Sequence, residues 1–252
     1  MINKISVVIP IFNEQDNISN LIKEINTVLQ KKITYEIVVV DDGSDDNTQE
    51  VLKKISKKRK NILIVTHKKN YGQSVGLKTG VLNAKYDFIA TLDGDGQNDP
   101  KDILKLLRSF NEKVDFMMVI GNRVKRIDSI SKKIASRLAF KIRKLILKDN
   151  TPDTGCALKI FRKKDFLLLP FFNHIHRFLP FLYKMFHGEV ISIAVNHRER
   201  NSGMSKYSNY ERFLVGINDI FGVVWLRKRS VWPIIIDKNK NIKRIRRVKY
   251  GN

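Results

Sequence analysis

Apolar runs alternate with amphipathic segments over the first 120 residues, and this alternation is what most constrains the fold. The runs cover residues 5–11, 35–40, 62–66, 87–92 and 114–120. Short runs of this kind, rich in Val and Ile, are typical of strands buried on both faces of a parallel sheet. The segments between them carry apolar residues at helical spacing. The sequence therefore predicts an α/β fold in which helices flank a mostly parallel sheet.

Polar residues follow four of these predicted strands. They are Asn13-Glu14, Asp41-Asp42, Asp93-Gly94-Asp95 and Asn122-Arg123. In open α/β sheets, ligands bind beyond the carboxyl ends of the strands, so the four clusters predict one shared site.

The strand ending at residue 92 is followed by two carboxylates, Asp93 and Asp95, on either side of Gly94. Residues two apart on an extended chain point to the same side. Two converging carboxylates suit a hard divalent cation that keeps positions open for a diphosphate. A solvated acidic turn is the alternative, because an Asp-x-Asp pair is short and acidic turns are common.

Length and composition narrow the class of protein. A chain of 252 residues forms one large α/β domain or two small ones, and we expect one domain over 1–226 with a basic tail over 227–252. The single cysteine, Cys156, excludes an internal disulfide framework and suits a reducing compartment. No run reaches about 18 uninterrupted apolar residues, so no clear transmembrane helix is predicted.

The net charge of +23 is concentrated in two segments. Residues 123–148 and 227–252 each hold ten Lys and Arg against a single Asp. Such stretches bind nucleic acid, an anionic membrane surface or an anionic substrate, or they form a solvated face. Charge alone does not choose among these readings.

The chain has neither a G-x-G-x-x-G motif after its first strand nor a Walker A motif. A different ordered set of short motifs is present: Val8-Ile9-Pro10-Ile11-Phe12-Asn13-Glu14, Val40-Asp41-Asp42-Gly43-Ser44, Asn70-Tyr71-Gly72-Gln73, Asp93-Gly94-Asp95-Gly96-Gln97-Asn98-Asp99-Pro100, Gly121-Asn122-Arg123, Asp153-Thr154-Gly155-Cys156 and Arg198-x-Arg200-x-x-Gly203-x-Ser205-Lys206-Tyr207. This order resembles the family 2 glycosyltransferases of the GT-A fold. Within them it is most similar to dolichol-phosphate mannosyltransferase and bacterial polyprenyl-phosphate glycosyltransferases. The resemblance covers roughly residues 3–226.

The resemblance implies a UDP- or GDP-sugar donor, inversion at the anomeric carbon, and Mg²⁺ or Mn²⁺ as cofactor. The implied metal ligands are Asp93, Asp95 and Gln97. The implied nucleotide-sugar site consists of Pro10, Asn13, Glu14, Asp42, Gln73 and Asp93. The implied catalytic residues are Asp93, Asp95, Arg123 and Asp153. For Asp42 a helix cap, and for Asp153 a simple turn residue, are the structural alternatives.

The implied acceptor is a polyprenyl phosphate. A phosphate is ionised near neutral pH, so it needs cations to hold it and no strong general base. The candidates for this role are Arg123, Lys132, Ser136, Arg200, Ser205 and Lys206. A glycan or another lipid is the rival acceptor, and a nucleic-acid-binding module is the rival outside enzymes. The sugar, the choice of UDP or GDP, the prenol and the oligomeric state, including a membrane-protein partner, stay open.

Monotopic attachment at the cytoplasmic face of the membrane is the expected location. The Phe- and Leu-rich segments 166–186 and 213–226 are the candidate amphipathic elements, flanked by the cations that begin at Arg227. The alternative is that these aromatic side chains pack in a core or a subunit interface.

Overall fold

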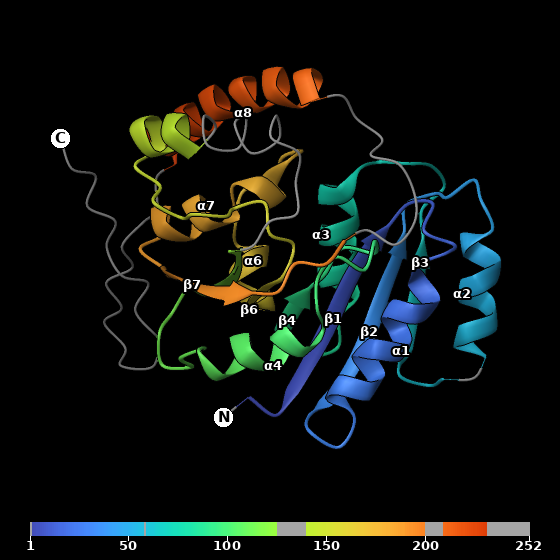
Figure 1. Ribbon diagram of the computed structural model, residues 1–252. Helices are drawn as coiled ribbons and strands as arrows, with labels where there is room; N and C mark the ends of the chain where they lie inside the picture. Colours follow the sequence, from blue (N-terminus) through green and yellow to red (C-terminus); the bar gives the residue numbers. More distant parts are fainter. Residues whose placement is uncertain (1, 58, 125–139, 200–208, 231–252) are drawn as a thin grey trace, which may run out of the picture.

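The computed structural model describes residues 2–57, 59–124, 140–199 and 209–230 (Figure 1). Its described strands form one seven-stranded sheet in the order β3-β2-β1-β4-β6-β5-β7. The strands are β1 (Lys4–Ile11), β2 (Thr34–Asp41), β3 (Ile62–Thr66), β4 (Phe88–Thr91), β5 (Met117–Arg123), β6 (Lys159–Arg162) and β7 (Glu189–Val195). Only β6 runs antiparallel to its neighbours among these strands. The mostly parallel α/β sheet predicted from the sequence is confirmed.

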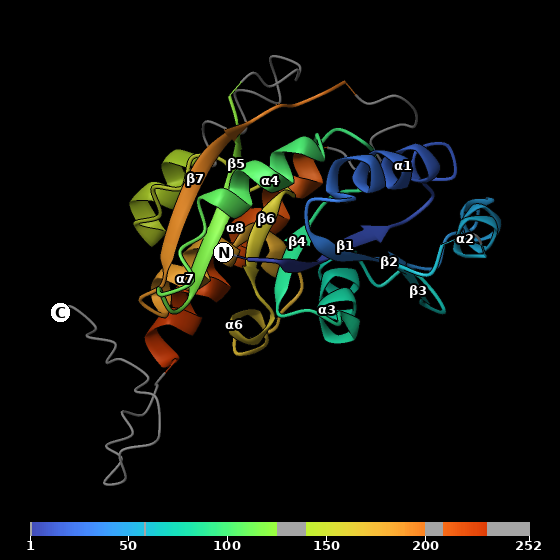
Figure 2. The same ribbon diagram turned by 90° about the horizontal axis from the view of Figure 1, so that it is seen from below.

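Helices cover both faces of the sheet (Figure 2). They are α1 (Ile18–Leu29), α2 (Thr48–Ser56), α3 (Gln73–Asn83), α4 (Lys101–Arg108), α6 (Lys163–Leu167), the 3₁₀ turn η1 (Ile175–Arg177), α7 (Leu179–Met185) and α8 (Asn209–Arg229). Residues 140–147 are also helical, and the rest of the helix predicted over 131–148 lies outside the described residues. The helices α1, α2 and α4 supply side chains to one core cluster, and α3, α6, α7 and α8 to another.

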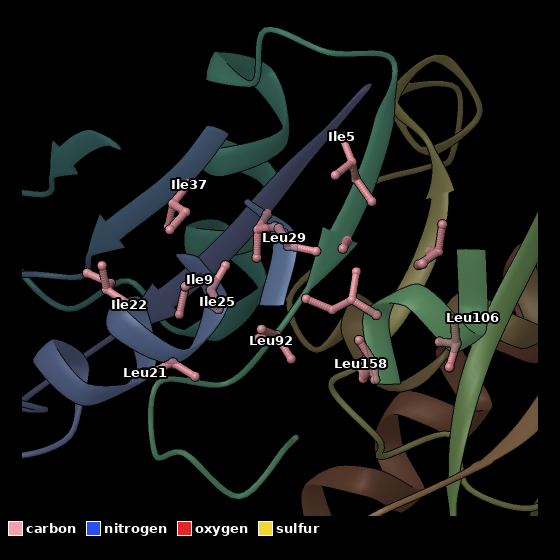
Figure 3. Packing of buried hydrophobic residues seen from close by; sticks show 14 of the residues in the cluster. Ile5, Ile9, Leu21, Ile22, Ile25, Leu29, Ile37, Leu92, Leu106 and Leu158 are labelled. Atoms are coloured by element: carbon pink, nitrogen blue, oxygen red, sulfur yellow. The ribbon is translucent and has the colours of Figure 1, made fainter. Parts of the chain in front are cut away.

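The first cluster shows why the amphipathic segments become helices. In α1, Ile18, Leu21, Ile22, Ile25 and Leu29 recur at helical spacing and are all buried. They pack on the side chains that β1 and β2 direct to the same face (Figure 3). This burial is the main stabilising contribution, at about 25 cal/mol for each Å² of apolar surface removed from water.

For residues 166–186, the alternatives were association with a membrane and packing in a core. The second cluster shows that many of these side chains pack in the core. The buried side chains there include Phe166, Phe178, Leu182 and Tyr183, so the core alternative holds for them. Three large apolar side chains in that segment, at 167, 168 and 171, stay exposed.

The long helix α8 has two different sides. Ile220 and Val223 are buried against the second cluster, whereas Phe221 and Trp225 are 65% and 62% exposed. Among the residues described, no helix combines the length and the apolar character needed to cross a bilayer.

Candidate functional site

The loops that follow β1 and β2 are tied together by side chains. Asn13 has a left-handed backbone with φ 56°, and its N–H donates to Ser44 Oγ at 2.9 Å. The N–H of Asp45 donates back to Asn13 Oδ1 at 3.0 Å. The N–H of Glu14 donates to Thr48 Oγ1 at 2.9 Å, at the start of α2. The predicted residues Asn13 and Glu14 therefore belong to one rigid loop pair at the carboxyl edge of the sheet.

The loop after β4 comes very close to the end of β1 at Gly94. A Cβ placed on Gly94 would lie 2.5 Å from Ile11 Cγ2 and 3.3 Å from Glu14 Cγ. A glycine is needed because no side chain fits in that space. This close approach places Asp93 and Asp95 beside the Asn13-Glu14 loop, as the sequence predicted.

Pro10, near the end of β1, lies against α3. A Cβ placed on Gly76 would come within 2.9 Å of Pro10 Cβ, so the helix packs closely over this strand. The same helix begins at Gln73, whose Nε2 donates to Asp93 Oδ1 at 2.7 Å. The structure thus brings Pro10, Gln73 and Asp93 to one corner of the site.

Asp93 lies in an environment that opposes its charge. Burial, and then the charges of Asp95 and Glu14, raise the pKa of Asp93 to about 7, although Lys159 and Arg123 act in the opposite direction. A divalent cation at this position would offset the repulsion between the carboxylates.

The donor set fits a hard cation that takes further ligands from elsewhere. Asp93 and Asp95 supply carboxylate oxygens, the ligands that Mg²⁺ and Mn²⁺ prefer. Within the described part of the chain, no three His, Cys, Asp or Glu side chains form a complete metal cluster. Gln97 sits beside the pair: its N–H donates to Asp95 Oδ1 at 3.1 Å, and its side-chain amide donates to the carbonyl of Arg198 at 3.4 Å. Two carboxylates with open positions suit an ion that also binds a diphosphate.

Asp42 is buried and does not act as a helix cap. Its Oδ2 accepts the N–H of Gly72 at 2.7 Å, and its Oδ1 accepts the N–H of Tyr71 at 3.0 Å and contacts His67 Nδ1 at 2.7 Å. These bonds anchor the loop that leads into α3. Asp42 therefore builds the wall of the site at its β2 side.

Arg123 and Asp153 form a two-pronged ion pair that the sequence did not predict. Arg123 Nε donates to Asp153 Oδ2 at 2.7 Å and Nη2 donates to Oδ1 at 2.8 Å. The side chains are only 15% and 6% exposed. Burial alone would lower the pKa of Arg123, but its bonds to Asp153 outweigh this and raise it. The two predicted residues lie together, with each charge satisfied by the other.

Lys159 is a site residue that sequence reasoning missed. It lies on β6 opposite Thr91 of β4, and its side chain is buried, with Nζ donating to the carbonyl of Cys156. Burial lowers the pKa of Lys159, while the charges of Cys156, Asp93 and Asp153 act to raise it. A lysine inside the apolar run 157–161 was the signal in the sequence, since a buried cation calls for anionic neighbours.

Several predicted acceptor residues lie outside the described part of the chain. They are Lys132, Ser136, Arg200, Ser205 and Lys206. Arg198, two residues before Arg200, belongs to the described residues. Its guanidinium lies 2.6 Å from Glu24 Oε2 and 2.8 Å from Asp99 Oδ1. This double contact ties Arg198 to α1 and to the loop after β4.

A family model and solved structures match this chain. The family model described as "Glycosyl transferase family 2" matches residues 6–168. A structure of glucosyl-3-phosphoglycerate synthase from Mycobacterium tuberculosis, in complex with Mn²⁺, uridine diphosphate and phosphoglyceric acid, superposes with a TM-score of 0.66. It is 16% identical over 89% of this chain and 78% of its own.

Two further structures share the fold. Mannosyl-3-phosphoglycerate synthase from Rubrobacter xylanophilus has a TM-score of 0.65 at 14% identity, over 89% of this chain and 74% of its own. S. aureus TarS 1-349, in complex with UDP-GlcNAc, has a TM-score of 0.59 at 20% identity, over 88% of this chain and 66% of its own. The fold class expected from the sequence motifs is confirmed.

Proposed function

The chain belongs to glycosyl transferase family 2, and from that premise we propose that it is an inverting, metal-dependent transferase that moves a sugar from a nucleotide to a polyprenyl phosphate. The observation that carries the proposal is the half-buried carboxylate pair Asp93 and Asp95 at the carboxyl edge of the sheet, beside the loop that follows β1. A bound divalent cation would favour the ionised form of a carboxylate that lies beside a second negative charge, and a nucleoside diphosphate would supply the remaining ligands of that cation.

In this proposal, Asp93, Asp95 and Gln97 hold Mg²⁺ or Mn²⁺. The ion offsets the negative charge that develops on the nucleoside diphosphate as it leaves the sugar. The M. tuberculosis relative in complex with Mn²⁺ and uridine diphosphate supports this assignment.

A second set of residues is assigned to bind the nucleotide-sugar. Pro10, Asn13, Glu14 and Asp42 form the side of the site toward β1 and β2, and we assign the nucleoside to them. Gln73 is assigned to orient Asp93, because its amide already donates to that carboxylate. UDP and GDP remain equal candidates, since both carry the same diphosphate.

The Arg123–Asp153 pair favours an acceptor that is already ionised. A hydroxyl acceptor needs a general base to take its proton, and a carboxylate bound by both prongs of a guanidinium is a weak base. A phosphate needs no base, because it is ionised near neutral pH. Asp153 then has a positioning role, holding Arg123 at the edge of the site.

The acceptor phosphate is assigned to cations around this pair. The proposed residues are Arg123, Lys132, Ser136, Arg200, Ser205 and Lys206. Lysine among them binds phosphate as a point charge, whereas arginine offers a planar fork. A glycan, another lipid or a small phosphorylated acid is the competing acceptor, the last because two relatives of the same fold are phosphoglycerate glycosyl synthases.

We also propose that the enzyme works at the cytoplasmic face of an anionic membrane. The support comes from α8, which exposes Phe221 and Trp225 and ends in Arg227, Lys228 and Arg229. An exposed apolar side followed by cations suits the interface between lipid headgroups and acyl chains.

A sugar-transfer assay tests this proposal. The purified protein is incubated with radiolabelled UDP- and GDP-sugars, in the presence of Mn²⁺ or of EDTA. The acceptor is undecaprenyl phosphate, 3-phosphoglycerate or none. We expect organic-extractable label only with the lipid phosphate and only with the metal. Label in a water-soluble product would overturn the proposed acceptor, and label that survives EDTA would overturn the metal assignment.

A further inference from the structure

Successive residues at the start of α3 are held by different parts of the molecule. The N–H of Gly72 donates to Asp42 Oδ2 at 2.7 Å. The side chain of Gln73 donates to Asp93 Oδ1 at 2.7 Å. Ser74, which is fully buried, is hydrogen-bonded through Oγ to His176 Nδ1 at 2.7 Å. Because these residues share one helical turn, a displacement at Ser74 would also move Gln73 and its bond to Asp93.

The other side of this connection leads to α8. His176 belongs to η1, and His174 directly precedes that turn. The Nδ1 atom of His174 lies 3.0 Å from Asp219 Oδ2 on α8, with side chains 29% and 18% exposed. Ile175, between the two histidines, is buried, so the turn is anchored in the core while its histidines face two different helices.

The contact between His176 and Ser74 is of a kind that persists near neutral pH. Burial lowers the pKa of His176 well below its usual value, so its imidazole stays neutral and bonds Ser74 as one neutral group to another. The two histidine rings lie 6.4 Å apart, edge to face. We call this set of side chains the histidine path: Asp219, His174, His176, Ser74, Gln73 and Asp93.

We propose that the histidine path couples the position of α8 to the geometry of Asp93. The inference rests on the proposed function for the identity of the ligands at the two ends, a membrane surface at α8 and a nucleotide with its metal at Asp93. Coupling of this kind is reciprocal: a surface that shifts α8 changes nucleotide affinity, and nucleotide changes the affinity for that surface by the same factor. The enzyme would then load its donor most effectively in the place where its lipid acceptor is found.

The test uses variants that spare the residues assigned to nucleotide and metal. Asp219→Ala removes the partner of His174, and Ser74→Ala removes the partner of His176. Asn218→Ala is the matched control, because it changes an exposed neighbour on the same helix. One readout is amide hydrogen exchange of Tyr71 and Gly72 in nucleotide-free protein, where both amides bond Asp42. The other is the affinity for UDP and GDP with Mn²⁺, measured by calorimetry.

We expect Asp219→Ala to speed exchange at residues 71–72 and to weaken metal-dependent nucleotide binding about fivefold or more, the low end of typical coupling between sites. Asn218→Ala should change neither the exchange rate nor the nucleotide affinity. Asp219→Glu, which keeps a carboxylate for His174, should leave both as they are in the unaltered protein. The double variant Asp219→Ala/Ser74→Ala should be no worse than Ser74→Ala alone, because both changes break one path. In the unaltered protein, vesicles of phosphatidylglycerol and phosphatidylcholine should change nucleotide affinity, and Ser74→Ala should remove that change.

The coupling would be overturned if Asp219→Ala speeds exchange within α8 but leaves residues 71–72 and nucleotide affinity as they are in Asn218→Ala. Full additivity of the two single variants would overturn it as well. An unaltered protein that binds neither nucleotide would instead count against the proposed function. The exchange measurement, which needs no nucleotide, would still decide whether α8 and α3 are coupled.

Discussion

At Asp93, burial and a neighbouring carboxylate work against ionisation, whereas a bound cation would work in its favour. The raised pKa of about 7 means that the folded, metal-free protein holds a proton on Asp93 at pH values where the unfolded chain has lost it. Stability therefore falls as pH rises from about 4 toward 7, and the loss is complete above the folded pKa. In our account, this loss of stability follows from the position of Asp93 in the metal site.

Asp93→Asn should stabilise the metal-free protein in a pH-dependent way. The amide keeps an oxygen for Gln73 but carries no charge, so it escapes the repulsion from Asp95. The gain should be largest above pH 7 and should shrink as pH falls toward 4. Urea denaturation in EDTA at several pH values measures it. A gain that is the same at pH 5 and pH 8 would contradict the electrostatic explanation.

Gly94→Ala should destabilise the fold by about 1–3 kcal/mol, the usual cost of overpacking a tight site. The added Cβ would meet Ile11 Cγ2 at 2.5 Å, on a buried strand that has no room to shift. Gly222→Ala on α8 is the matched control, because a Cβ there meets nothing within 4 Å and alanine favours a helix. Equal unfolding midpoints for the two variants in urea would show that the loop after β4 is not tightly seated on β1.

At the scale of elements, the antiparallel strand β6 assembles much of the charge in the site. It lies between β4 and β5, which places Lys159 opposite Thr91 and next to the β5 strand that ends in Arg123. Asp153, in the loop before β6, then meets Arg123 across 30 residues of sequence. The strand β6 and the loop before it thus supply Lys159, whose charge acts on Asp93, and Asp153, which holds Arg123.

Periodicity in the sequence predicted the strands and helices well because each element buries one apolar stripe or run. The order of strands depends on long-range pairing, which periodicity does not encode, so the sequence did not place β6 between β4 and β5. For the same reason the Arg123–Asp153 pair and Lys159 were missed, although Arg123 and Asp153 were each singled out. The motif residues at the ends of β1 and β4 were predicted correctly as neighbours, since carboxyl ends of adjacent parallel strands always share one edge.

Breaking the Arg123–Asp153 pair from one side should cost stability as well as activity. Arg123→Ala removes the guanidinium from the buried carboxylate of Asp153, and we expect the free energy of unfolding to drop by about 3 kcal/mol. The double variant Arg123→Met/Asp153→Leu should recover part of that loss, because the buried carboxylate is removed together with its cation. Urea denaturation of the three proteins tests this. A double variant that is no more stable than Arg123→Ala would contradict this explanation.

At the scale of the whole molecule, the helix α8 carries both exposed aromatic side chains and a group of cations in its last turn. Figure 1 shows α8 lying across one side of the molecule, over the layer that contains α6 and α7. Its inward side chains belong to the core, and its outward aromatics do not. This arrangement leaves Phe221 and Trp225 available without disturbing the fold.

Removing the two exposed aromatics should weaken binding to anionic vesicles. We expect Phe221→Ala/Trp225→Ala to reduce vesicle partitioning about tenfold or more, equivalent to roughly 1.4 kcal/mol, while the melting temperature stays the same. Leu63→Ala/Leu82→Ala, which removes two exposed apolar side chains from β3 and α3, is the control. Binding should also fall as salt is raised, because cations near the surface are screened. Equal partitioning of both double variants in a sedimentation assay would argue against α8 as the membrane face.

The central claim is that the strand-end carboxylates bind a nucleoside diphosphate through a divalent cation. The most direct measurement is a calorimetric titration of UDP and of GDP into the protein, with Mn²⁺ and again with EDTA, alongside Asp95→Ala. The account predicts that one nucleotide binds about tenfold or more tightly with the metal, and that Asp95→Ala loses this difference while staying folded. Equal affinity with Mn²⁺ and EDTA, or a metal effect that survives Asp95→Ala, would contradict it.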